Sequence, residues 1–202
     1  TGKNHERVIC LLSGGIDSPV AVWLIAKKGL KPICVYFDNS PFADETTKQR
    51  TLEVLKKLQG LIAENMKLYV VPHGADLADI LRNCQRNLTC ILCRRMMYRV
   101  AERIALNEDA EAIATGEIIG EHASQTLQNL RVETEALSTV TVLRPLIGMN
   151  KTEVEHLARK IGTFDSYAER TIEFLSVSLF PISHMSSLVD KGFPLVSLAI
   201  WS

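Results

Sequence analysis

Residues 10–20, CLLSGGIDSPV, interrupt a hydrophobic run with the glycine-rich segment 13–15. The preceding stretch, 8–12, has the length and apolar character of a short buried strand. Proline is tolerated in the first turn of a helix, and after Pro19 residues 20–28 continue with helical spacing. The sequence therefore predicts a strand-to-helix turn whose free N–H groups and helix dipole suit a phosphate. An ordinary turn is the alternative, but the order Ser-Gly-Gly-x-Asp-Ser favours the anion site.

Segments with strand character alternate with segments of helical spacing as far as about residue 165. The expected strands span 8–12, 31–37, 68–71, 110–114 and 139–143. The expected helices span 20–28, 43–65 with a break at Gly60, 76–84, 91–106, 123–130 and 150–161. This alternation predicts an α/β fold, with a mainly parallel, doubly wound, Rossmann-like sheet of about five strands.

The regular pattern also predicts where the folded core ends. The last expected helix has Thr152 and Glu155 at capping-box spacing and Gly162 as its stop signal. After Asp165 the chain is apolar, rich in serine and hard to assign to helices or strands. We therefore expect one domain over residues 1–165 and a divergent extension over residues 166–202.

Composition and charge limit the classes of protein to which this chain could belong. Lys and Arg number 23, as do Asp and Glu, so the formal net charge is zero and gives no general sign of nucleic acid or membrane binding. No apolar stretch is long enough to span a membrane, and residues 1–7 are polar, unlike a signal peptide. The odd number of cysteines, five, fits the reducing cytosol better than a disulfide framework. We expect a cytoplasmic protein.

Unusual residues cluster at the predicted carboxyl ends of strands, which is where parallel α/β sheets bind ligands. The first strand runs into segment 13–15, the second ends in 36–38 (YFD), and the fourth is followed by 115–117 (TGE). The Walker pattern GxxxxGK[ST], in which lysine reaches the β- and γ-phosphates, does not occur in the sequence. A phosphate site here would therefore bind ATP without a Walker lysine.

The SGGIDS loop resembles the PP-loop of ATP pyrophosphatases, which cleave ATP between the α- and β-phosphates and adenylate their substrate. Three later segments narrow the resemblance: RRMMYRVAERIA (94–105), TGEIIGEHASQTLQNL (115–130) and LRPLIGMNKTEVEHLARKIGTFD (143–165). Together with SGGIDSPVA they resemble the ThiI family of tRNA 4-thiouridine synthetases, or tRNA sulfurtransferases, which many organisms also link to thiamine thiazole synthesis. The resemblance covers residues 8–165.

The resemblance implies a site for ATP and Mg²⁺. Its pyrophosphate-binding positions fall on Ser13, Gly14, Gly15, Asp17 and Ser18, and Asp17 would also help to bind Mg²⁺. The remaining ATP positions fall on Leu11, Leu12, Tyr36, Phe37, Arg94, Gly116 and Gln125. The strand-end residues among them would act through backbone groups while their side chains pack in the core. An arginine can neutralise phosphate charge, and a glycine allows close backbone approach.

The resemblance also implies a reaction and its partners. ATP would adenylate the C4 oxygen of a tRNA uridine, and sulfur from a donor, either a cysteine desulfurase or sulfide, would then displace AMP. Two alternatives remain open. The first is another PP-loop adenylating enzyme, which acts on a different base or on a small molecule. The second is a non-catalytic ATP-binding module that is completed by a partner chain.

The pair Cys90 and Cys93 opens the helix that carries Arg94 and Arg95. A helix start beside arginines favours a reactive thiolate, so both cysteines are candidates for catalytic sulfur chemistry. By resemblance to archaeal family members, the pair could instead ligate an iron–sulfur cluster with a further cysteine, for which Cys84 is nearest in sequence. Incidental cysteines are the third interpretation. The two remaining cysteines lie in expected strands and are predicted to be buried: Cys10 and Cys34.

Some features of the family have no counterpart in the sequence. Members carry a sulfur-handling cysteine soon after IGTFD, whereas no cysteine follows Cys93 here. Neither a tRNA-gripping THUMP region nor a rhodanese domain is recognisable. Two interpretations follow: a THUMP-bearing partner or a homo-oligomer supplies the missing functions, or the chain is a truncated or diverged member of the family.

Other charged residues carry weaker signals. A basic helix face formed by Arg95, Arg99 and Arg103 fits either RNA or, with Glu102 nearby, plain solvent. The five histidines are expected at the surface or in capping positions: His5, His73, His122, His156 and His184.

Overall fold

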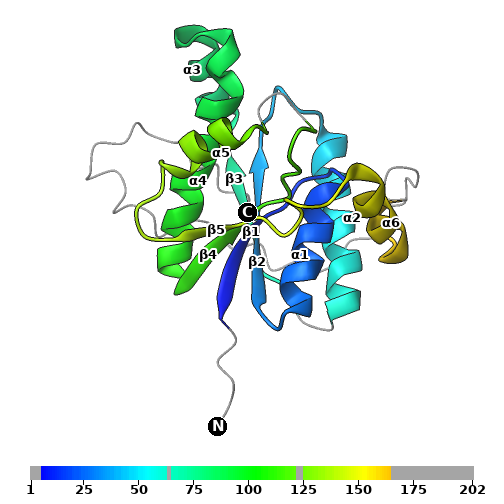
Figure 1. Ribbon diagram of the computed structural model, residues 1–202. Coiled ribbons are helices and arrows are strands. Elements are labelled where there is room, and N and C mark those ends of the chain that lie inside the picture. The colour runs from blue at the N-terminus through cyan, green and yellow to red at the C-terminus, as the bar shows by residue number, and fades with distance from the viewer. Residues whose placement is uncertain (1–5, 63–64, 122–124, 165–202) are drawn as a thin grey trace.

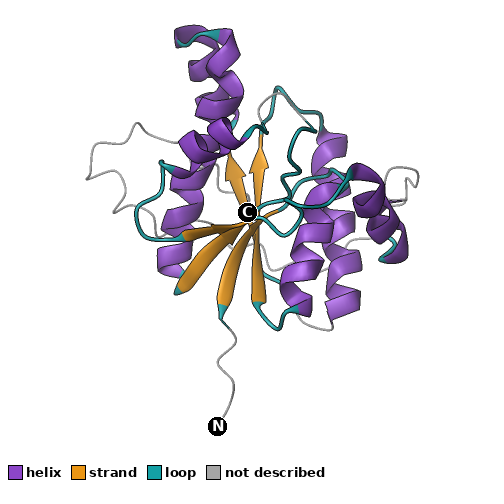
Figure 2. Ribbon diagram, viewed as in Figure 1, coloured by secondary structure: helices purple, strands orange, loops and turns teal. Residues whose placement is uncertain are grey.

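Five parallel strands form one sheet in the computed structural model, which describes residues 6–62, 65–121 and 125–164 (Figures 1 and 2). The strands are β1 (Arg7–Leu11), β2 (Lys31–Asp38), β3 (Leu68–Pro72), β4 (Ala110–Ala114) and β5 (Thr141–Leu143). Their order across the sheet is β3-β2-β1-β4-β5, and each neighbouring pair is parallel. The predicted α/β fold with a parallel, doubly wound sheet is confirmed.

Helices cover both faces of this sheet. They are α1 (Asp17–Lys27), α2 (Glu45–Ile62), α3 (Gly74–Asn83), α4 (Thr89–Asn107), α5 (Leu127–Thr134) and α6 (Lys151–Lys160), with a 3₁₀ turn, η1 (Arg86–Leu88), before α4. Helices α1 and α2 pack on one face, α4 packs on the other, and α6 packs against the outer side of α1. Helix α3 packs against α4 and stands beyond the carboxyl edge of the sheet, at the top of Figure 1.

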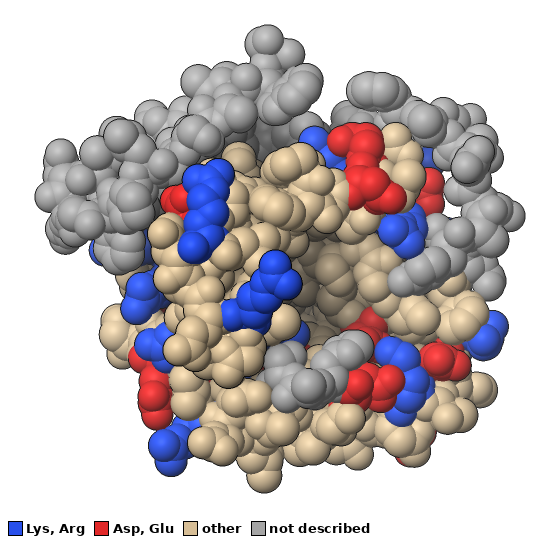
Figure 3. Space-filling model, turned by 90° about the horizontal axis from the view of Figure 1, so that it is seen from above, with Lys and Arg blue, Asp and Glu red and all other residues tan. Residues whose placement is uncertain are grey.

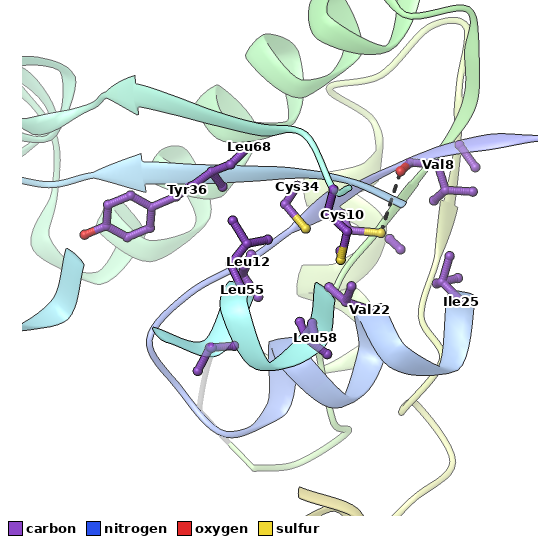
Figure 4. Packing of buried hydrophobic residues seen from close by; sticks show 14 residues of the cluster. Val8, Cys10, Leu12, Val22, Ile25, Cys34, Tyr36, Leu55, Leu58 and Leu68 are labelled. Atoms are coloured by element: carbon purple, nitrogen blue, oxygen red, sulfur yellow. Dashed lines mark hydrogen bonds between the residues drawn. The ribbon is translucent and has the colours of Figure 1, made fainter. Parts of the chain in front are cut away.

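Alternation along the strands explains why the sheet needs cover on both faces. Val8 and Cys10 of β1 pack toward α1 and α2, whereas Ile9 packs toward α4. Figure 4 shows the first of these clusters, in which Cys10 and Cys34 lie among aliphatic side chains. Both thiols are buried as predicted, and burial raises the pKa of Cys34 to about 12.

Several expected helix boundaries were wrong, for local reasons. Helix α2 does not break at Gly60 but continues to Ile62, because burial of its apolar face outweighs the ~1 kcal/mol helix penalty of one glycine. The capping box of α6 uses Asn150 and Glu153 rather than Thr152 and Glu155, since the helix begins at Lys151. Helix α5 begins at Leu127 and not at 123. The expected extension, 166–202, lies outside the described residues.

The strand order places the site. The chain moves outward from β1 to β2 and β3, then returns across the sheet to β4 on the other side of β1. The loops after β1 and β4 therefore diverge from adjacent strands at the carboxyl edge, which is the usual ligand position in such sheets. None of the described helices is long and apolar enough to cross a membrane.

Candidate functional site

A pocket of about 470 Å³ opens at the carboxyl ends of β1, β2 and β4. Figure 3 looks down on this end of the molecule and shows a hollow near its centre, with charged side chains standing around it. The predicted residues that line the pocket are Leu11, Leu12, Ser13, Gly15, Asp17, Ser18, Phe37, Cys90, Cys93, Arg94, Gly116 and Gln125. The fold thus brings most of the predicted site residues to one cavity of the size that binds small molecules.

Two predicted residues face elsewhere. The side chain of Tyr36 is buried on the face of the sheet that α1 and α2 cover. Gly14 is explained by the close approach of α2, because a Cβ atom there would lie 2.9 Å from the carbonyl oxygen of Thr47. Packing thus explains the buried side chain of Tyr36 and the absence of one at Gly14, and any contact of either residue with a nucleotide would have to come from the backbone.

Hydrogen bonds between two serines hold the loop after β1 in shape. The backbone N–H of Ser13 donates to Ser18 Oγ at 2.8 Å, and the two hydroxyl oxygens lie 3.0 Å apart. The N–H of Gly15 donates to Ser13 Oγ at 3.3 Å. Helix α1 then begins at Asp17, and the preceding residue, Ile16, places no side-chain cap on its first turn. The N–H groups of Ser13 and Gly15 are thus engaged within the loop, and the uncapped first-turn N–H groups of α1 are the donors left for an anion.

Asp17 is paired with a lysine that the sequence analysis did not single out. Lys151 Nζ, from the first turn of α6, lies 2.8 Å and 3.1 Å from the two carboxylate oxygens of Asp17. Both side chains keep some exposure, 33% for Lys151 and 23% for Asp17. This ion pair ties α6 to the start of α1 and places a cation and an anion together at the predicted phosphate site.

Gly116 lets the loop after β4 touch the first turn of α1. A Cβ atom at this position would lie 2.8 Å from the backbone nitrogen and 2.9 Å from the Cα of Ser18. Backbone atoms cannot yield as a flexible side chain can, so any larger residue must push the two loops apart. The glycine that the family resemblance assigns to ATP thus has a clear structural role in shaping the pocket.

We expect Gly116→Ala to weaken ATP binding about tenfold or more, because it displaces the first turn of α1 from the phosphate site. Titration calorimetry with ATP would measure the effect. Gly148→Ala is the matched control, since a Cβ atom at Gly148 meets nothing within 4 Å. Equal ATP affinities for the two variants would contradict this role for the glycine.

Arg94 reaches the pocket from α4, but its charge is already compensated. Its Nη1 atom forms an ion pair with Glu117, a carboxylate that is only 1% exposed. Glu117 is also held by Arg144 Nε at 2.7 Å and by the hydroxyl groups of Thr115, at 2.7 Å, and Tyr98, at 3.0 Å. Burial alone would raise the pKa of Glu117, but these partners outweigh it and hold the pKa below its usual value.

Two buried polar groups beside this network lack hydrogen-bond partners among the described residues, although Arg94 Nε lies 3.8 Å from Glu133 Oε1. Gln125 lines the pocket at 5% exposure, and its Oε1 atom has no hydrogen bond within that part of the chain. Both carboxylate oxygens of Glu133 are likewise buried without one. Burial, helped by the nearby charge of Glu117 and opposed by Arg94, raises the pKa of Glu133 to about 7. An unpaired amide oxygen in a pocket wall points to a ligand that donates hydrogen bonds.

The two candidate cysteines lie on the first turns of α4, as predicted, and both line the pocket. Cys90 is exposed, whereas the Sγ atom of Cys93 lies 3.2 Å from Nε2 of His73. His73 occupies the N-cap position of α3, as the capping alternative predicted, whereas the surface alternative was wrong. Its side chain is fully buried and makes no capping hydrogen bond, because the end of β3 directs it under α4.

The charged side chains on and beside the basic face of α4 are not all surrounded by solvent, because two of them bond to neighbouring backbone groups. Arg95 donates to the carbonyl oxygen of Val132. Glu102 is buried and accepts hydrogen bonds from the backbone N–H groups of Ser138, at 2.8 Å, and Thr139, at 2.7 Å. The carboxylate that favoured plain solvent in the sequence instead fastens a loop to the helix.

Comparisons with known proteins agree with this geometry. The sequence model of the family described as "Thiamine biosynthesis protein (ThiI)" matches residues 3–183. A relative from Methanosarcina mazei, named "Probable tRNA sulfurtransferase", is 41% identical over 160 residues, covering 79% of this chain and 39% of the relative. A relative of the same name from Acetivibrio thermocellus is 44% identical over 165 residues, covering 82% of this chain and 41% of the relative. The chain therefore spans about two-fifths of the length of these relatives.

Solved structures give the same picture. The chain is similar to a protein described as "4-thiouridine synthetase - RNA complex with bound ATP", with a TM-score of 0.78 and 32% identity over 92% of this chain and 49% of that one. An NMN synthetase from Francisella tularensis, at 18% identity and a TM-score of 0.55 over 84% of this chain and 66% of that one, shares the fold alone. Because the family match spans most of the sequence and the PP-loop stands at the predicted strand end, the chain belongs to the ThiI family.

Proposed function

We propose that this chain is the adenylating part of a tRNA sulfurtransferase, which uses ATP to make 4-thiouridine. One observation carries the proposal: a single pocket holds both a phosphate-binding loop, with Ser13 and Asp17, and the thiol of Cys93. Adenylation needs the first and sulfur transfer needs the second. The ATP and RNA bound to the similar 4-thiouridine synthetase support the same assignment.

The residues of the pocket fit ATP. The uncapped first turn of α1, beside the loop after β1, offers N–H groups to the phosphates. The Oε1 atom of Gln125, which has no hydrogen bond within the described part of the chain, can accept from a ligand amine. Asp17 is the carboxylate that would hold Mg²⁺, because this ion is usually bound by one or two carboxylates together with substrate phosphates. When bound, Mg²⁺ would neutralise charge on the departing pyrophosphate. Lys151 adds a second positive charge beside the same carboxylate.

The proposed chemistry overcomes a poor leaving group. The C4 oxygen of the uracil attacks the α-phosphorus of ATP, an O–P bond forms, and pyrophosphate departs. Sulfur then adds to C4, and the oxygen leaves as part of AMP. The contribution of the pocket is to align the two reactants and to stabilise charge on the phosphates.

An iron–sulfur cluster fits the described residues poorly. Such clusters take mainly cysteine ligands, so Cys90 and Cys93 would need at least one more. Residues 6–62, 65–121 and 125–164 gather no group of three or more potential ligands arranged around a metal. No step of the proposed reaction therefore passes through a cluster. The sulfur donor, either a cysteine desulfurase or sulfide, remains a prediction. So does the partner, either a THUMP-bearing chain or a second copy in a homo-oligomer.

The reaction is tested by the dependence of AMP formation on tRNA. With ATP and a persulfide donor present, we expect unmodified tRNA to stimulate AMP release about tenfold or more, because only a bound uracil oxygen can accept the adenylyl group. The matched control is the same tRNA already carrying 4-thiouridine, which offers no C4 oxygen at the target position.

Each possible result of this assay indicates a different function for the chain. Stimulation by unmodified tRNA alone supports tRNA thiolation. AMP release that ignores tRNA would indicate a PP-loop enzyme for another substrate, and tight ATP binding without cleavage would indicate a non-catalytic module.

A further inference from the structure

A buried imidazole joins the thiol of Cys93 to a carboxylate at the edge of the pocket. His73, between β3 and α3, has its Nε2 atom 3.2 Å from Cys93 Sγ and its Nδ1 atom 3.1 Å from Asp76 Oδ2. Asp76 lies in the first turn of α3, and Cys93 comes from α4. A thiol from α4 and an imidazole–carboxylate pair from the start of α3 thus form one hydrogen-bonded line that ends at the pocket.

This order of groups is the one by which proteins activate a nucleophile: a base beside the nucleophile, itself oriented by a third group. We propose that Cys93 is the sulfur-accepting nucleophile of this chain, that His73 is its base, and that Asp76 positions His73. The inference rests on the proposed thiolation and goes beyond it, since it chooses between the two cysteines and assigns two residues outside the family motifs.

The surroundings of His73 favour this role. Burial by itself would lower the pKa of His73, but its hydrogen bonds to Asp76 and Cys93 outweigh burial and raise the pKa to about 9. A ring that holds its proton at neutral pH can donate to a carboxylate on one side and to a thiolate on the other. The edge of the ring also packs against Phe37, with 5.5 Å between centroids, which restricts its rotation.

The other charged groups near the pair are engaged elsewhere. Asp38, whose carbonyl oxygen accepts from the N–H of His73, binds Ser40 and Lys48 through its carboxylate. Arg94, which follows Cys93 on α4, is paired with Glu117. Asp76 is therefore the carboxylate that acts directly on the imidazole.

The proposed step balances without an external oxidant or reductant. The imidazolium of His73 holds the proton at Nε2 and keeps Cys93 as a thiolate, which attacks the terminal sulfur of a persulfide donor, RS–SH. A bond forms between Cys93 Sγ and that sulfur, the S–S bond of the donor breaks, and its electron pair leaves as the thiolate RS⁻. The transferred sulfur keeps its proton, so Cys93 becomes a persulfide inside the pocket that would hold the adenylated base.

Two other cysteines serve as internal references: Cys84, at the C-cap of α3, and Cys90, in α4. Cys84 and Cys90 are both exposed, whereas Cys93 is only partly so. On accessibility alone, Cys93 should react more slowly than either with an alkylating reagent. A faster reaction of Cys93 would have to come from its chemical surroundings.

We expect iodoacetamide at about pH 6.5 to alkylate Cys93 about tenfold or more faster than Cys84, measured peptide by peptide with mass spectrometry. His73→Gln should abolish this advantage, and Asp76→Asn should reduce it. The differences should fade as the pH rises above about 9, where unassisted thiols also ionise. In an NMR titration, His73 should lose its proton near pH 9, and Cys93→Ser should lower that midpoint.

His73 is buried, so His73→Gln could fail to fold. In that case the reactivity of Cys93 in Asp76→Asn and the titration of His73 in the wild-type protein test the proposal. Cys93 reacting no faster than Cys84 in the wild-type protein, or iron bound by Cys90 and Cys93 after anaerobic preparation, would overturn the proposal. AMP release by the wild-type protein is a separate measurement. An inert Cys93 in a protein that releases AMP would refute this inference alone, and a reactive Cys93 in a protein that never cleaves ATP would refute only the proposed function.

Discussion

Asp17→Ala should lower pyrophosphate release from ATP more than ~100-fold while leaving the fold intact. The side chain stands at the start of α1 and lines the pocket, and it is the carboxylate proposed to hold Mg²⁺ there. Its loss would also leave Lys151 without its counter-ion. Because both side chains are partly exposed, water can solvate the lysine, and we expect little loss of stability. A coupled assay for pyrophosphate and a thermal melt would measure the two effects.

Asp79→Ala provides the matched control, since its carboxylate is 69% exposed and forms only a surface ion pair with Arg82. This variant should release pyrophosphate at the wild-type rate. If the Asp17→Ala protein remains folded and releases pyrophosphate at the wild-type rate, the proposed role of this loop in ATP cleavage is wrong.

The largest effect on stability should come from Glu117→Gln. Glu117 is buried and compensates both Arg94, which is 30% exposed, and Arg144, which is 16% exposed. Glutamine keeps the shape but removes the charge, so two partly buried guanidinium groups lose their counter-ion. Breaking a buried pair in this way costs about 3 kcal/mol. We expect the free energy of unfolding in urea to fall by that amount.

The pH dependence offers a second check on Glu117. Its pKa in the folded protein is held below the ordinary value of 4.5, so its contribution is fully present above about pH 4.5 and is lost as the pH falls through the folded pKa. The gap between wild type and Glu117→Gln should therefore shrink in acid. Glu111→Gln, on the exposed side of β4, should change stability little at any pH. A loss below about 1 kcal/mol for Glu117→Gln would contradict the ion network.

The architecture could be predicted because each strand is a short apolar run and each helix has an amphipathic pattern. The strands of a parallel sheet are buried on both faces, so β1 and β2 are readable without knowing their partners. Helix ends depended on weaker local signals. At Gly60, packing of the helix overrode the propensity of one residue, and at Asn150 one cap was chosen over another two residues away.

The position of the loop after β1, which is proposed to bind phosphate, was predictable for a different reason: its residues are adjacent in the sequence. Lys151 lies 134 residues from Asp17, and only the packing of α6 on α1 brings them together. Glu117 and Lys151 stood inside segments already quoted for the family, so a search for charged residues within those motifs could have found both.

His73 carried a signal of a third kind. It directly follows the last residue of β3, Pro72, and therefore stands at the carboxyl edge of the sheet where ligands bind. That position, rather than any spacing to another histidine, marked it as a site residue. Its partner Cys93 is 20 residues away and on another element, so the sequence alone could not show the contact.

The pocket is proposed to cleave ATP between the α- and β-phosphates. The most direct test is to incubate the protein with ATP labelled at the α-phosphate, Mg²⁺, a persulfide donor and unmodified tRNA, and to separate the products by chromatography. We predict that the label appears in AMP, at a rate that Asp17→Ala abolishes. Label in ADP, or label that stays in ATP while tRNA is bound, would contradict the account.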